Sequence, residues 1–498
     1  MPTPTLNRRS FLKTSALATA GLALSARSWS QVVGANGDVR VAVVGLNGRG
    51  KSHLESLAKA KGARVVALCD ADSAVLARAA ASVGGGVKTY VDLRDLLASP
   101  DVDAITIAMP NHWHSLAGIW AMQAGKDIYI EKPVSHNIWE GIQLEAASRK
   151  YNRVVQAGTQ IRSGEGLREA HAWVRSGAIG KITASRGFCY KYRPSIGQVG
   201  QTPPPPSTVN LDLWCGPSPL VAPHRAQFHY NWHWFWETGN GDVGNQGIHQ
   251  MDVARWFLGE PGLPRHTMSV GGRVGYVDDG QTPNTQVIVH DYASAPLIFE
   301  VRGLPAKAAE AGSGPAGGSA EAADAAAKLM DDVRGVKIGN IVECEGGRLV
   351  ASSYFEARAY DTAGNLLKEF KGVDRHMQNF IDVVHSRRTA DLYGPIGEGR
   401  VSSALCHLGN ISHLVGAKAG PDETRERIAA DASLSEAYGR MTEHLGRNNV
   451  DVGKTPLVLG APLAVDDAAG RFTGENSFVA NALLTRDYRQ PFAVPQLA

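Results

Sequence analysis

The sequence predicts an α/β protein of two domains. A doubly wound parallel sheet comes first, and an α+β domain with an open, mainly antiparallel sheet follows it. Short apolar runs alternate with helix-forming segments over residues 38–156, as in β-α-β units. After this region strand-like runs follow one another, for example at residues 182–192. A chain of 498 residues is also too long for one ordinary core, so a second domain is expected over residues 157–498.

The first apolar run, Val39 to Val44, leads into a glycine-rich turn, and the next strand-like run ends at Asp70. Backbone N–H groups of such a turn can approach a pyrophosphate. The carboxylate of Asp70 can accept hydrogen bonds from ribose hydroxyls, and its charge disfavours a 2′-phosphate, so NAD is expected rather than NADP. The cofactor-binding residues predicted here are Gly45, Asn47, Gly48, Arg49, Gly50 and Asp70.

This turn departs from the pattern G-x-G-x-x-G. Asn47 stands at the middle glycine position, and Gly48 comes one residue later. Taken alone, the turn is as consistent with an ordinary tight turn as with a nucleotide site. The order of strand, glycine turn, helix, strand and acid favours the nucleotide site.

Another β-α-β unit covers residues 103–133. Ala104 to Ala108 is an apolar run, typical of a strand buried on both faces. Pro110 and Asn111 break it, a helix is expected over residues 115–124, and the next strand follows. Ligands of parallel sheets bind at the carboxyl ends of the strands. Lys132, which follows the last strand of the unit, is therefore a candidate catalytic group.

Composition excludes some classes of protein. The hydrophobic content of 43% and the charged content of 20% are ordinary for a globular protein. The five cysteines form no C-x-x-C pair, so buried thiols are expected rather than a disulfide framework, and no metal is predicted. No basic tract is long enough to indicate a nucleic-acid partner.

The first 30 residues have the layout of a twin-arginine export signal. Arg8 and Arg9 precede an apolar stretch at residues 16–24, and small residues follow. The alternative is a membrane anchor, but this stretch is too short to span about 30 Å of hydrocarbon. Removing residues 1–30 takes away four basic residues and no acid, which changes the formal net charge from +3 to about −1. We expect a mature chain without a membrane anchor, exported through the twin-arginine pathway to the periplasm or beyond.

Two segments of the second domain are expected to be loops. Residues 201–207 contain four successive prolines, and residues 306–327 are rich in Ala, Gly, Ser and Glu. The second segment is predicted to be a flexible insertion. A functional lid is the alternative, although a solvated loop is favoured.

The densest chemistry of the second domain lies between Phe228 and Trp256. Aromatic and polar side chains alternate in its first half, as in sites where sugar rings stack on aromatic faces. A glycine-rich stretch then leads to His249, which is expected to begin a helix. A lone histidine is more often structural, but one that follows such a stretch favours a functional role. The substrate-contacting residues predicted here are Trp232, His233, Asp242 and Asp252.

The order of these motifs resembles the Gfo/Idh/MocA family, the glucose-fructose oxidoreductase and inositol dehydrogenase group, in an exported form. The similarity runs from about Val39 to Asn410 and rests on the motifs above together with Glu131-Lys132-Pro133 and Gly247-x-His249. It implies a Rossmann domain, a nicotinamide held across the strand ends, and Lys132 and His249 as the active-site pair. Family members often associate through the open sheet, so a homo-oligomer is expected. Further cofactor-binding residues are expected at Pro110, Asn111, His114, Glu131, Lys132 and Gln160, and Arg162 is expected to contact substrate.

One residue departs from the family pattern. Asn245 stands where many members have an aspartate, so it cannot act as a base, although it can orient a hydroxyl. Asp242 or Asp252 is a candidate for the missing carboxylate. We expect His249 to take the hydroxyl proton, while Lys132 stabilises negative charge on the same oxygen.

Three functions remain open from the sequence. The first is a sugar oxidoreductase with a tightly bound NAD that is recycled internally, since export leaves no external nicotinamide pool. The second is an NAD-dependent glycoside-cleaving enzyme that works by oxidation, elimination and reduction. The third is a sugar-binding protein without turnover. In each case the expected partner is a small sugar or glycoside.

Overall fold

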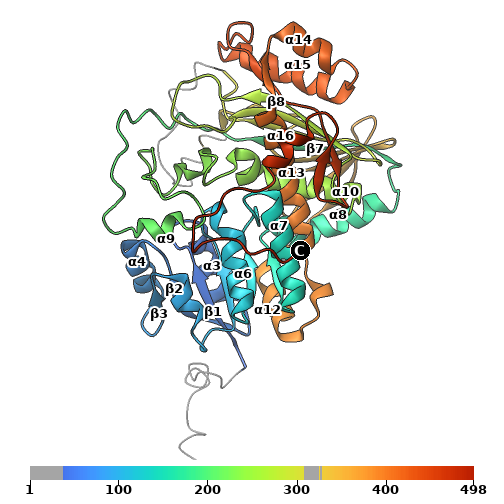
Figure 1. Ribbon diagram of the computed structural model, residues 1–498. Helices are drawn as coiled ribbons and strands as arrows, with labels where there is room; N and C mark the ends of the chain where they lie inside the picture. The colour runs from blue at the N-terminus through green and yellow to red at the C-terminus, as the bar shows by residue number, and fades with distance from the viewer. Residues whose placement is uncertain (1–36, 308–324, 326–327) are drawn as a thin grey trace, which may run out of the picture.

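The structure is a computed structural model that describes residues 37–307, 325 and 328–498. The predicted export signal and all but a few residues of the predicted insertion lie outside the described residues. Figure 1 shows a first domain built on a parallel sheet and a second domain built on a larger sheet above it. The α/β class predicted from the sequence is confirmed.

The first domain holds a six-stranded sheet in the order β3-β2-β1-β4-β5-β6, and all its strands are parallel. Every residue of β4 is buried, as its apolar sequence predicts. From β1 the chain adds β2 and β3 on one side, and from β4 it adds β5 and β6 on the other side. At the point between β1 and β4 where the strand order reverses, a crevice opens at the carboxyl ends of the strands. The strands are β1 Val39–Val44, β2 Ala63–Cys69, β3 Lys88–Tyr90, β4 Ala104–Ile107, β5 Asp127–Ile130 and β6 Val155–Ala157.

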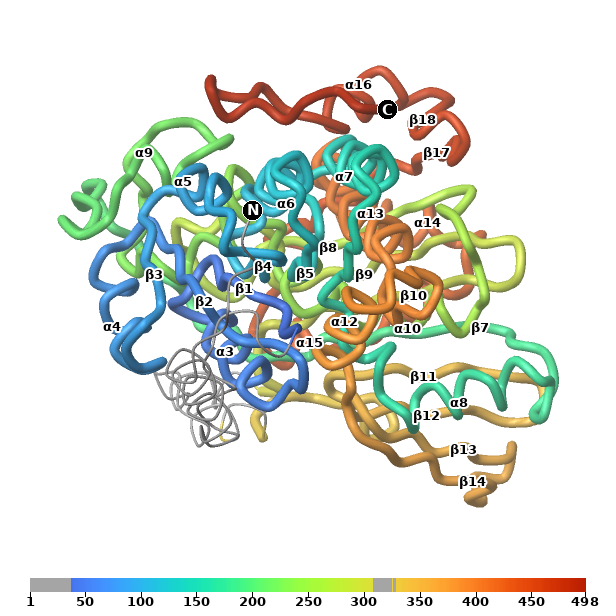
Figure 2. Tube along the Cα trace, turned by 90° about the horizontal axis from the view of Figure 1, so that it is seen from below, coloured from blue at the N-terminus to red at the C-terminus, as the bar shows by residue number. Residues whose placement is uncertain are grey.

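Helices cover both faces of this sheet (Figure 2). Asp72 caps the N-terminus of α4 by accepting hydrogen bonds from Ala74 and Val75, and Asn137 caps α7 in the same way. A helix from late in the sequence also packs here, because Met377 and Phe380 join the core that contains Val41. The helices are α3 Arg49–Lys59, α4 Ser73–Val83, α5 Leu93–Leu97, α6 His114–Gln123, α7 Ile138–Lys150 and the late α12 His376–Ser386.

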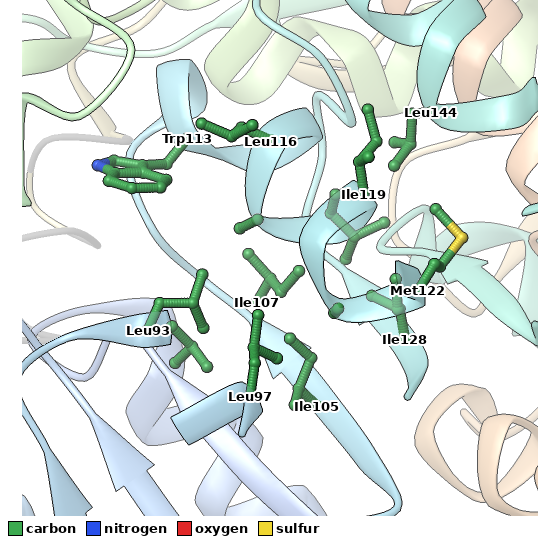
Figure 3. Packing of buried hydrophobic residues seen from close by; sticks show 14 of the residues in the cluster. Leu93, Leu97, Ile105, Ile107, Trp113, Leu116, Ile119, Met122, Ile128 and Leu144 are labelled. Carbon is green, nitrogen blue, oxygen red and sulfur yellow. The ribbon is translucent and has the colours of Figure 1, made fainter. Parts of the chain in front are cut away.

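The core on the other face of the sheet is drawn in Figure 3, where Leu93, Ile105 and Leu116 pack together. The end of the chain completes this core. Phe492 is buried, and its ring centroid lies 5.5 Å from that of Trp113. Residues nearly 400 positions apart therefore share one hydrophobic cluster.

The second domain is built on a 12-stranded sheet. Its strands pair antiparallel except for β7 and β10, which are parallel neighbours, so the sheet is mainly antiparallel as predicted. The main path runs β14-β13-β12-β11-β7-β10-β9-β8-β16-β15, and β17 and β18 lie off it. The strands are β7 Ile182–Tyr190, β8 His266–Gly272, β9 Thr285–Asp291, β10 Leu297–Arg302, β11 Ile338–Cys344, β12 Gly347–Ala351, β13 Ala357–Asp361, β14 Leu366–Phe370, β15 Ala417–Ala419, β16 Leu457–Leu459, β17 Leu463–Asp466 and β18 Arg471–Thr473.

Helices lie on both faces of this second sheet as well. On the face toward the first domain, Met251 and Leu405 pack against Phe299. On the opposite face, Tyr438 and Met441 of α15 pack against the β8–β10 part of the sheet. The helices are α8 Glu165–Arg175, α9 Leu211–Cys215, α10 Ile248–Leu258, α13 Ile396–Val415, α14 Pro421–Ile428, α15 Ala432–Arg447 and α16 Ser477–Ala482, with short helices η1 Asn111–Trp113, η2 Gln160–Ser163, η3 Asn231–Trp234, η4 Val243–Gly247 and η6 Thr389–Asp391.

A long connection after β7 returns to the first domain, and we call its residues 201–236 the strap. Asp72 and Val209 form an isolated antiparallel bridge there. The Ser73 N–H donates to the Thr208 carbonyl at 2.9 Å, and the Asn210 N–H donates to the Ala71 carbonyl at 2.8 Å. Helix α9 of the strap begins at Leu211, directly after these contacts. The strap therefore lies over the end of β2, where the sequence predicts the cofactor's ribose.

Candidate functional site

A cavity of about 340 Å³ lies at the carboxyl ends of β1, β2, β4 and β5. Its lining comes from the first domain, from the strap and from η4 of the second domain. The predicted site residues that line it are Gly45, Asn47, Gly48, Arg49, Asp70, Pro110, Asn111, His114, Glu131, Lys132, Trp232, His233 and Asn245.

The glycine turn has the close approaches that a nucleotide site requires. Gly45 has φ of +82°, and a Cβ on it would lie 2.6 Å from the Ala108 carbonyl oxygen. A Cβ on Gly50 would lie 1.9 Å from the carbonyl oxygen of Gly45. Only glycine fits at both positions, and the turn places the N-terminus of α3 against the cavity. This cradle suits a pyrophosphate, because free N–H groups at a helix N-terminus bind anions.

Asp70 follows β2 and lines the cavity beside the glycine turn. Its carboxylate accepts hydrogen bonds from the Leu46 N–H at 2.8 Å and from the Asp72 N–H at 2.9 Å. Burial raises the pKa of Asp70 above its ordinary value. These two bonds fix the orientation of the carboxylate, and its remaining lone pairs suit the hydroxyls of a ribose.

Pro110, Asn111 and His114 form the turn after β4. Asn111 donates a hydrogen bond to Asn240 of the second domain at 2.9 Å. The ring nitrogens of His114 lie 2.5 Å from the Pro133 carbonyl oxygen and 2.7 Å from that of Met109. This turn therefore ties together the ends of two neighbouring strands and the second domain.

Glu131 is buried at the centre of a polar cluster. It accepts hydrogen bonds from Arg49 Nε at 2.9 Å and from Gln160 Nε2 at 3.0 Å, and His53 Nε2 lies 3.1 Å away. Burial alone would raise the pKa of Glu131, but the hydrogen bond with His53 and the charge of Arg49 outweigh it and hold the pKa well below its ordinary value. The carboxylate thus anchors Arg49 across the glycine turn, while Gln160 supports the cluster from outside the cavity lining.

Lys132 faces the cavity beside Asn245 of η4. Its Nζ donates a hydrogen bond to the Asn245 backbone carbonyl at 2.5 Å. Burial lowers the pKa of Lys132 to about 8, against the charge of Glu131, which raises it. An ammonium group poised near neutral pH can both polarise an oxygen and exchange a proton.

His249 stands at the start of α10 and does not line the cavity. Its side chain is buried, and its Nδ1 has no hydrogen-bond partner among the described residues. The ring centroid lies 5.2 Å from that of Tyr354. Burial, and then the charge of Lys132, hold its pKa well below the ordinary value, so the imidazole is neutral.

The structure does not bring Arg162, Asp242 or Asp252 to the cavity lining. Arg162 and Asp252 form a buried ion pair with 2.8 Å between Nε and Oδ2. Asp242 is likewise buried and pairs with Arg193 at 2.6 Å. A buried carboxylate requires such a partner, because an unpaired charge is costly away from water. In this structure the three side chains are engaged in ion pairs outside the cavity lining, and their contact with substrate stays a prediction.

Only part of the aromatic run lines the cavity. Trp234 is buried, while Trp232 and His233 line the cavity. The two rings stack on each other with centroids 3.6 Å apart. His233 Nδ1 lies 2.6 Å from the Tyr230 carbonyl oxygen, to which it can only donate, so Nε2 keeps a lone pair. Burial lowers the pKa of His233 to about 3, which keeps the ring neutral.

Several lining residues were not predicted from the sequence. Ala71, Val91 and Asp92 surround the end of β2, and Met109 lies at the turn after β4. The strap adds Leu213, Trp214, His229 and Tyr230. The run of prolines marks the strap only as a loop, and no periodicity in the sequence indicates which surface it covers.

Among the described residues there is no cluster of histidine, cysteine or acidic side chains suited to hold a metal ion. No helix of the described part of the chain is long and apolar enough to cross a membrane.

A glycine-turn Rossmann sheet and a second α/β domain that share one cavity define a two-domain dinucleotide-binding protein. Residues 39–159 match the Gfo/Idh/MocA model described as an oxidoreductase family with an NAD-binding Rossmann fold. Residues 167–278 match the C-terminal alpha/beta domain of the same oxidoreductase family. Over these two stretches the chain is similar to the Gfo/Idh/MocA family.

Curated relatives share part of this chain. Inositol 2-dehydrogenase 3 of Saccharopolyspora erythraea is 34% identical over 162 residues, which cover 32% of this chain and 46% of the relative. A glycosyl hydrolase family 109 protein of Shewanella baltica is 30% identical over 203 residues, covering 36% of this chain and 44% of the relative. The chain thus spans less than half the length of these relatives.

Solved structures share the fold. The WlbA dehydrogenase of Bordetella pertussis, in complex with NADH and UDP-GlcNAcA, has a TM-score of 0.53 at 17% identity, over 75% of this chain and 95% of its own. An oxidoreductase of Agrobacterium radiobacter, in complex with NAD⁺, L-tartaric acid and magnesium, has a TM-score of 0.54 at 14% identity, over the same shares of the two chains.

Proposed function

We propose that this protein is an NAD-dependent oxidoreductase that acts on a hydroxyl of a carbohydrate or polyol and recycles its cofactor internally. The observation that carries this proposal is the cavity whose lining includes both the glycine turn with Asp70 and the side chains of Lys132, Asn245 and His233. A dinucleotide site and a set of proton-handling groups share that cavity. The domain type supports hydride chemistry, which a bound nicotinamide would supply.

NAD is proposed rather than NADP because of the acids at the end of β2. Asp70, Asp72 and Asp92 follow the ends of β2 and β3, and Asp70 and Asp92 line the cavity. A 2′-phosphate placed there would meet negative charge, whereas ribose hydroxyls would donate hydrogen bonds.

The roles of the chain's own groups follow from their protonation. The ammonium of Lys132 stabilises negative charge that develops on the reacting oxygen. His233 offers Nε2 as a neutral acceptor for a substrate hydroxyl, since its Nδ1 hydrogen is already donated to Tyr230. His249, the predicted base, is neutral and could take a proton only if substrate binding connects it to the cavity.

The relatives support a sugar or polyol as substrate. Their names refer to inositol and to glycosyl hydrolysis. The ring of Trp232 and the hydrogen-bonding groups of Asn245 and His233 line the same cavity, a combination that suits a hydroxylated ring. We further propose export through the twin-arginine pathway, on the motif Arg8-Arg9, with the cofactor bound before export, and a homo-oligomer in its final compartment.

A second candidate function is glycoside cleavage through transient oxidation. The similarity to glycosyl hydrolase family 109 proteins favours it. In that case the hydride returns to the substrate after elimination, so the cofactor shows no net change. Binding of sugar without turnover would be the remaining alternative.

The test begins with protein purified from the cytoplasm and denatured. Mass spectrometry of the released small molecules should find NAD or NADH in near-stoichiometric amount, and Asp70→Ala should lower that amount. Finding only NADP, or no dinucleotide and no affinity for NAD, would refute the cofactor assignment. Monosaccharides, inositols, sugar pairs and aryl glycosides are then screened by absorbance of the bound cofactor and by product analysis. Turnover of sugar pairs supports the oxidoreductase, and cleavage of a glycoside supports the second candidate.

A further inference from the structure

We propose that the strap, which belongs to the second domain, binds the adenosine half of the dinucleotide. Two contacts that hold the strap in place, His229 with Asp72 and Arg489 with Asp212, set the rate at which the dinucleotide dissociates, and we call these contacts latches. This inference rests on the proposed cofactor but not on any substrate. It assigns binding residues outside the Rossmann domain, Trp214 and His229 among them.

The first step is the position of the strap. Leu213, Trp214 and His229 line the cavity together with Asp70, Ala71 and Asp92 from the end of β2 and its neighbour β3. In a Rossmann sheet the acid after the second strand marks the ribose of the adenosine half. The strap residues therefore form the opposite wall at that half, and Trp214 is one of them.

The second step is how firmly the strap is seated. Trp113 Nε1 donates to the carbonyls of Leu213 at 3.0 Å and Trp214 at 3.1 Å. Gly216 permits this approach, because a Cβ there would lie 2.2 Å from the Trp113 ring. His112 Nε2 also lies 3.0 Å from the Trp214 carbonyl oxygen. The strap is thus packed on the turn after β4 and is not a free loop.

The first latch joins the strap to the start of α4. His229 Nε2 lies 2.8 Å from Asp72 Oδ2, and the other carboxylate oxygen of Asp72 caps α4. The pKa of Asp72 lies below its ordinary value because hydrogen bonds from Thr208, His229 and the α4 backbone outweigh its burial. The carboxylate is therefore charged and holds the strap by a charge-assisted contact.

The second latch joins the strap to the C-terminal tail. Arg489 Nη1 lies 2.6 Å from Asp212 Oδ1, and the same guanidinium donates to the carbonyls of Asp212 and Gly216. Neither Arg489 nor Asp212 lines the cavity. A substitution at this latch can therefore change dinucleotide release only by changing how firmly the strap is held. This latch tests the role of the strap without removing a side chain that lines the cavity.

Opening both latches gives the dinucleotide a path out. With the strap in place, the adenosine half is held between β2 and the strap, so release requires the strap to lift. Loss of the charge-assisted contact at either latch should speed release by up to about tenfold.

The experiment measures dissociation of NADH from the full-length holoprotein. Fluorescence of bound NADH is followed by stopped flow while excess NAD⁺ replaces it. Arg489→Ala and His229→Ala should each release NADH faster than wild type, by up to about tenfold. Asp422→Asn, at an exposed ion pair with Arg425 on α14, is the matched control and should release NADH at the wild-type rate.

A second variant tests the strap in the opposite direction. Asp72 and Val209 pair across an isolated antiparallel bridge, a geometry within reach of a disulfide. The double variant Asp72→Cys with Val209→Cys should release NADH faster than wild type when reduced and slower when oxidised. Equal rates in both redox states, or unchanged rates in Arg489→Ala and His229→Ala, overturn the inference while leaving the cofactor assignment intact. Wild-type protein that binds no NADH would instead refute the proposed cofactor.

Discussion

At the scale of single residues, Lys132 shows most directly how burial prepares a group for chemistry. Its pKa of about 8 lies below the ordinary lysine value of 10.5 because the ammonium is removed from water. Between these two values the unfolded chain binds more protons at Lys132 than the folded chain does. The free energy of unfolding therefore gains a contribution as pH rises from about 8 to about 10.5.

The variant Lys132→Met isolates this effect. The difference in free energy of unfolding between wild type and Lys132→Met should shift in favour of wild type as pH rises through that window, and it should be constant below about pH 7. Urea titrations at a series of pH values measure it. Turnover should fall about 10²- to 10⁴-fold in the variant, and in wild type it should decline above about pH 8 as the ammonium is lost. A pH-independent stability difference would contradict the assigned burial of the charge.

His233 leads to a prediction about binding instead of rate. Its Nε2 is a fixed acceptor, so His233→Ala should weaken binding of a hydroxyl-bearing sugar about tenfold. The loss should be the same from pH 5 to pH 8, because the pKa of His233 is about 3. Titration of bound-cofactor fluorescence with a sugar and with its deoxy derivatives tests this. If no deoxy sugar binds wild type and His233→Ala equally, His233 does not contact a substrate hydroxyl.

At the scale of elements, the glycine turn could be recognised from the sequence because its requirements are local. A strand, a positive φ at Gly45 and a helix start follow one another along the chain. The pairing of Arg162 with Asp252 could not be recognised, since the two residues lie on different helices and look like any polar side chains in the sequence. The contacts that hold the strap could not be recognised for the same reason, because they join residues 100 or more positions apart.

Two glycines allow a matched test of the turn. Gly50→Ala should abolish NAD binding and destabilise the protein, because the added Cβ would collide with the Gly45 carbonyl oxygen. Gly439→Ala, within α15 and with open space around its Cα, should stabilise the protein by about 0.5–1 kcal/mol. Thermal unfolding and NAD titration of both variants provide the measurements. Normal NAD affinity in Gly50→Ala would mean that the turn does not hold the pyrophosphate.

At the scale of the whole molecule, the parallel order of the first sheet and the mainly antiparallel second sheet were both predictable, since they follow from how strands and helices alternate. The positions of α12 and of the C-terminal tail on the first domain were not predictable. Their residues join its cores through packing alone, which leaves no motif in the sequence.

Two phenylalanines near the end of the chain test the tail. Phe492→Ala should lower the free energy of unfolding by about 3–5 kcal/mol, because the buried ring would leave a cavity beside Trp113. Phe478→Ala, at a side chain that is 89% exposed, should change it by less than about 0.5 kcal/mol. Chemical denaturation of the two variants compares them directly, and equal effects would contradict the packing of the tail.

The place of Phe492 also has a consequence for biosynthesis. A ribosome completes the strands of the first domain long before it adds the residues that close that domain's core. During translation the apolar surface that Phe492 later covers stays exposed on the nascent Rossmann domain, and chaperones can bind there. A polypeptide whose synthesis stops some ten residues early would keep that surface exposed, so proteases and folding factors could tell it from the finished product.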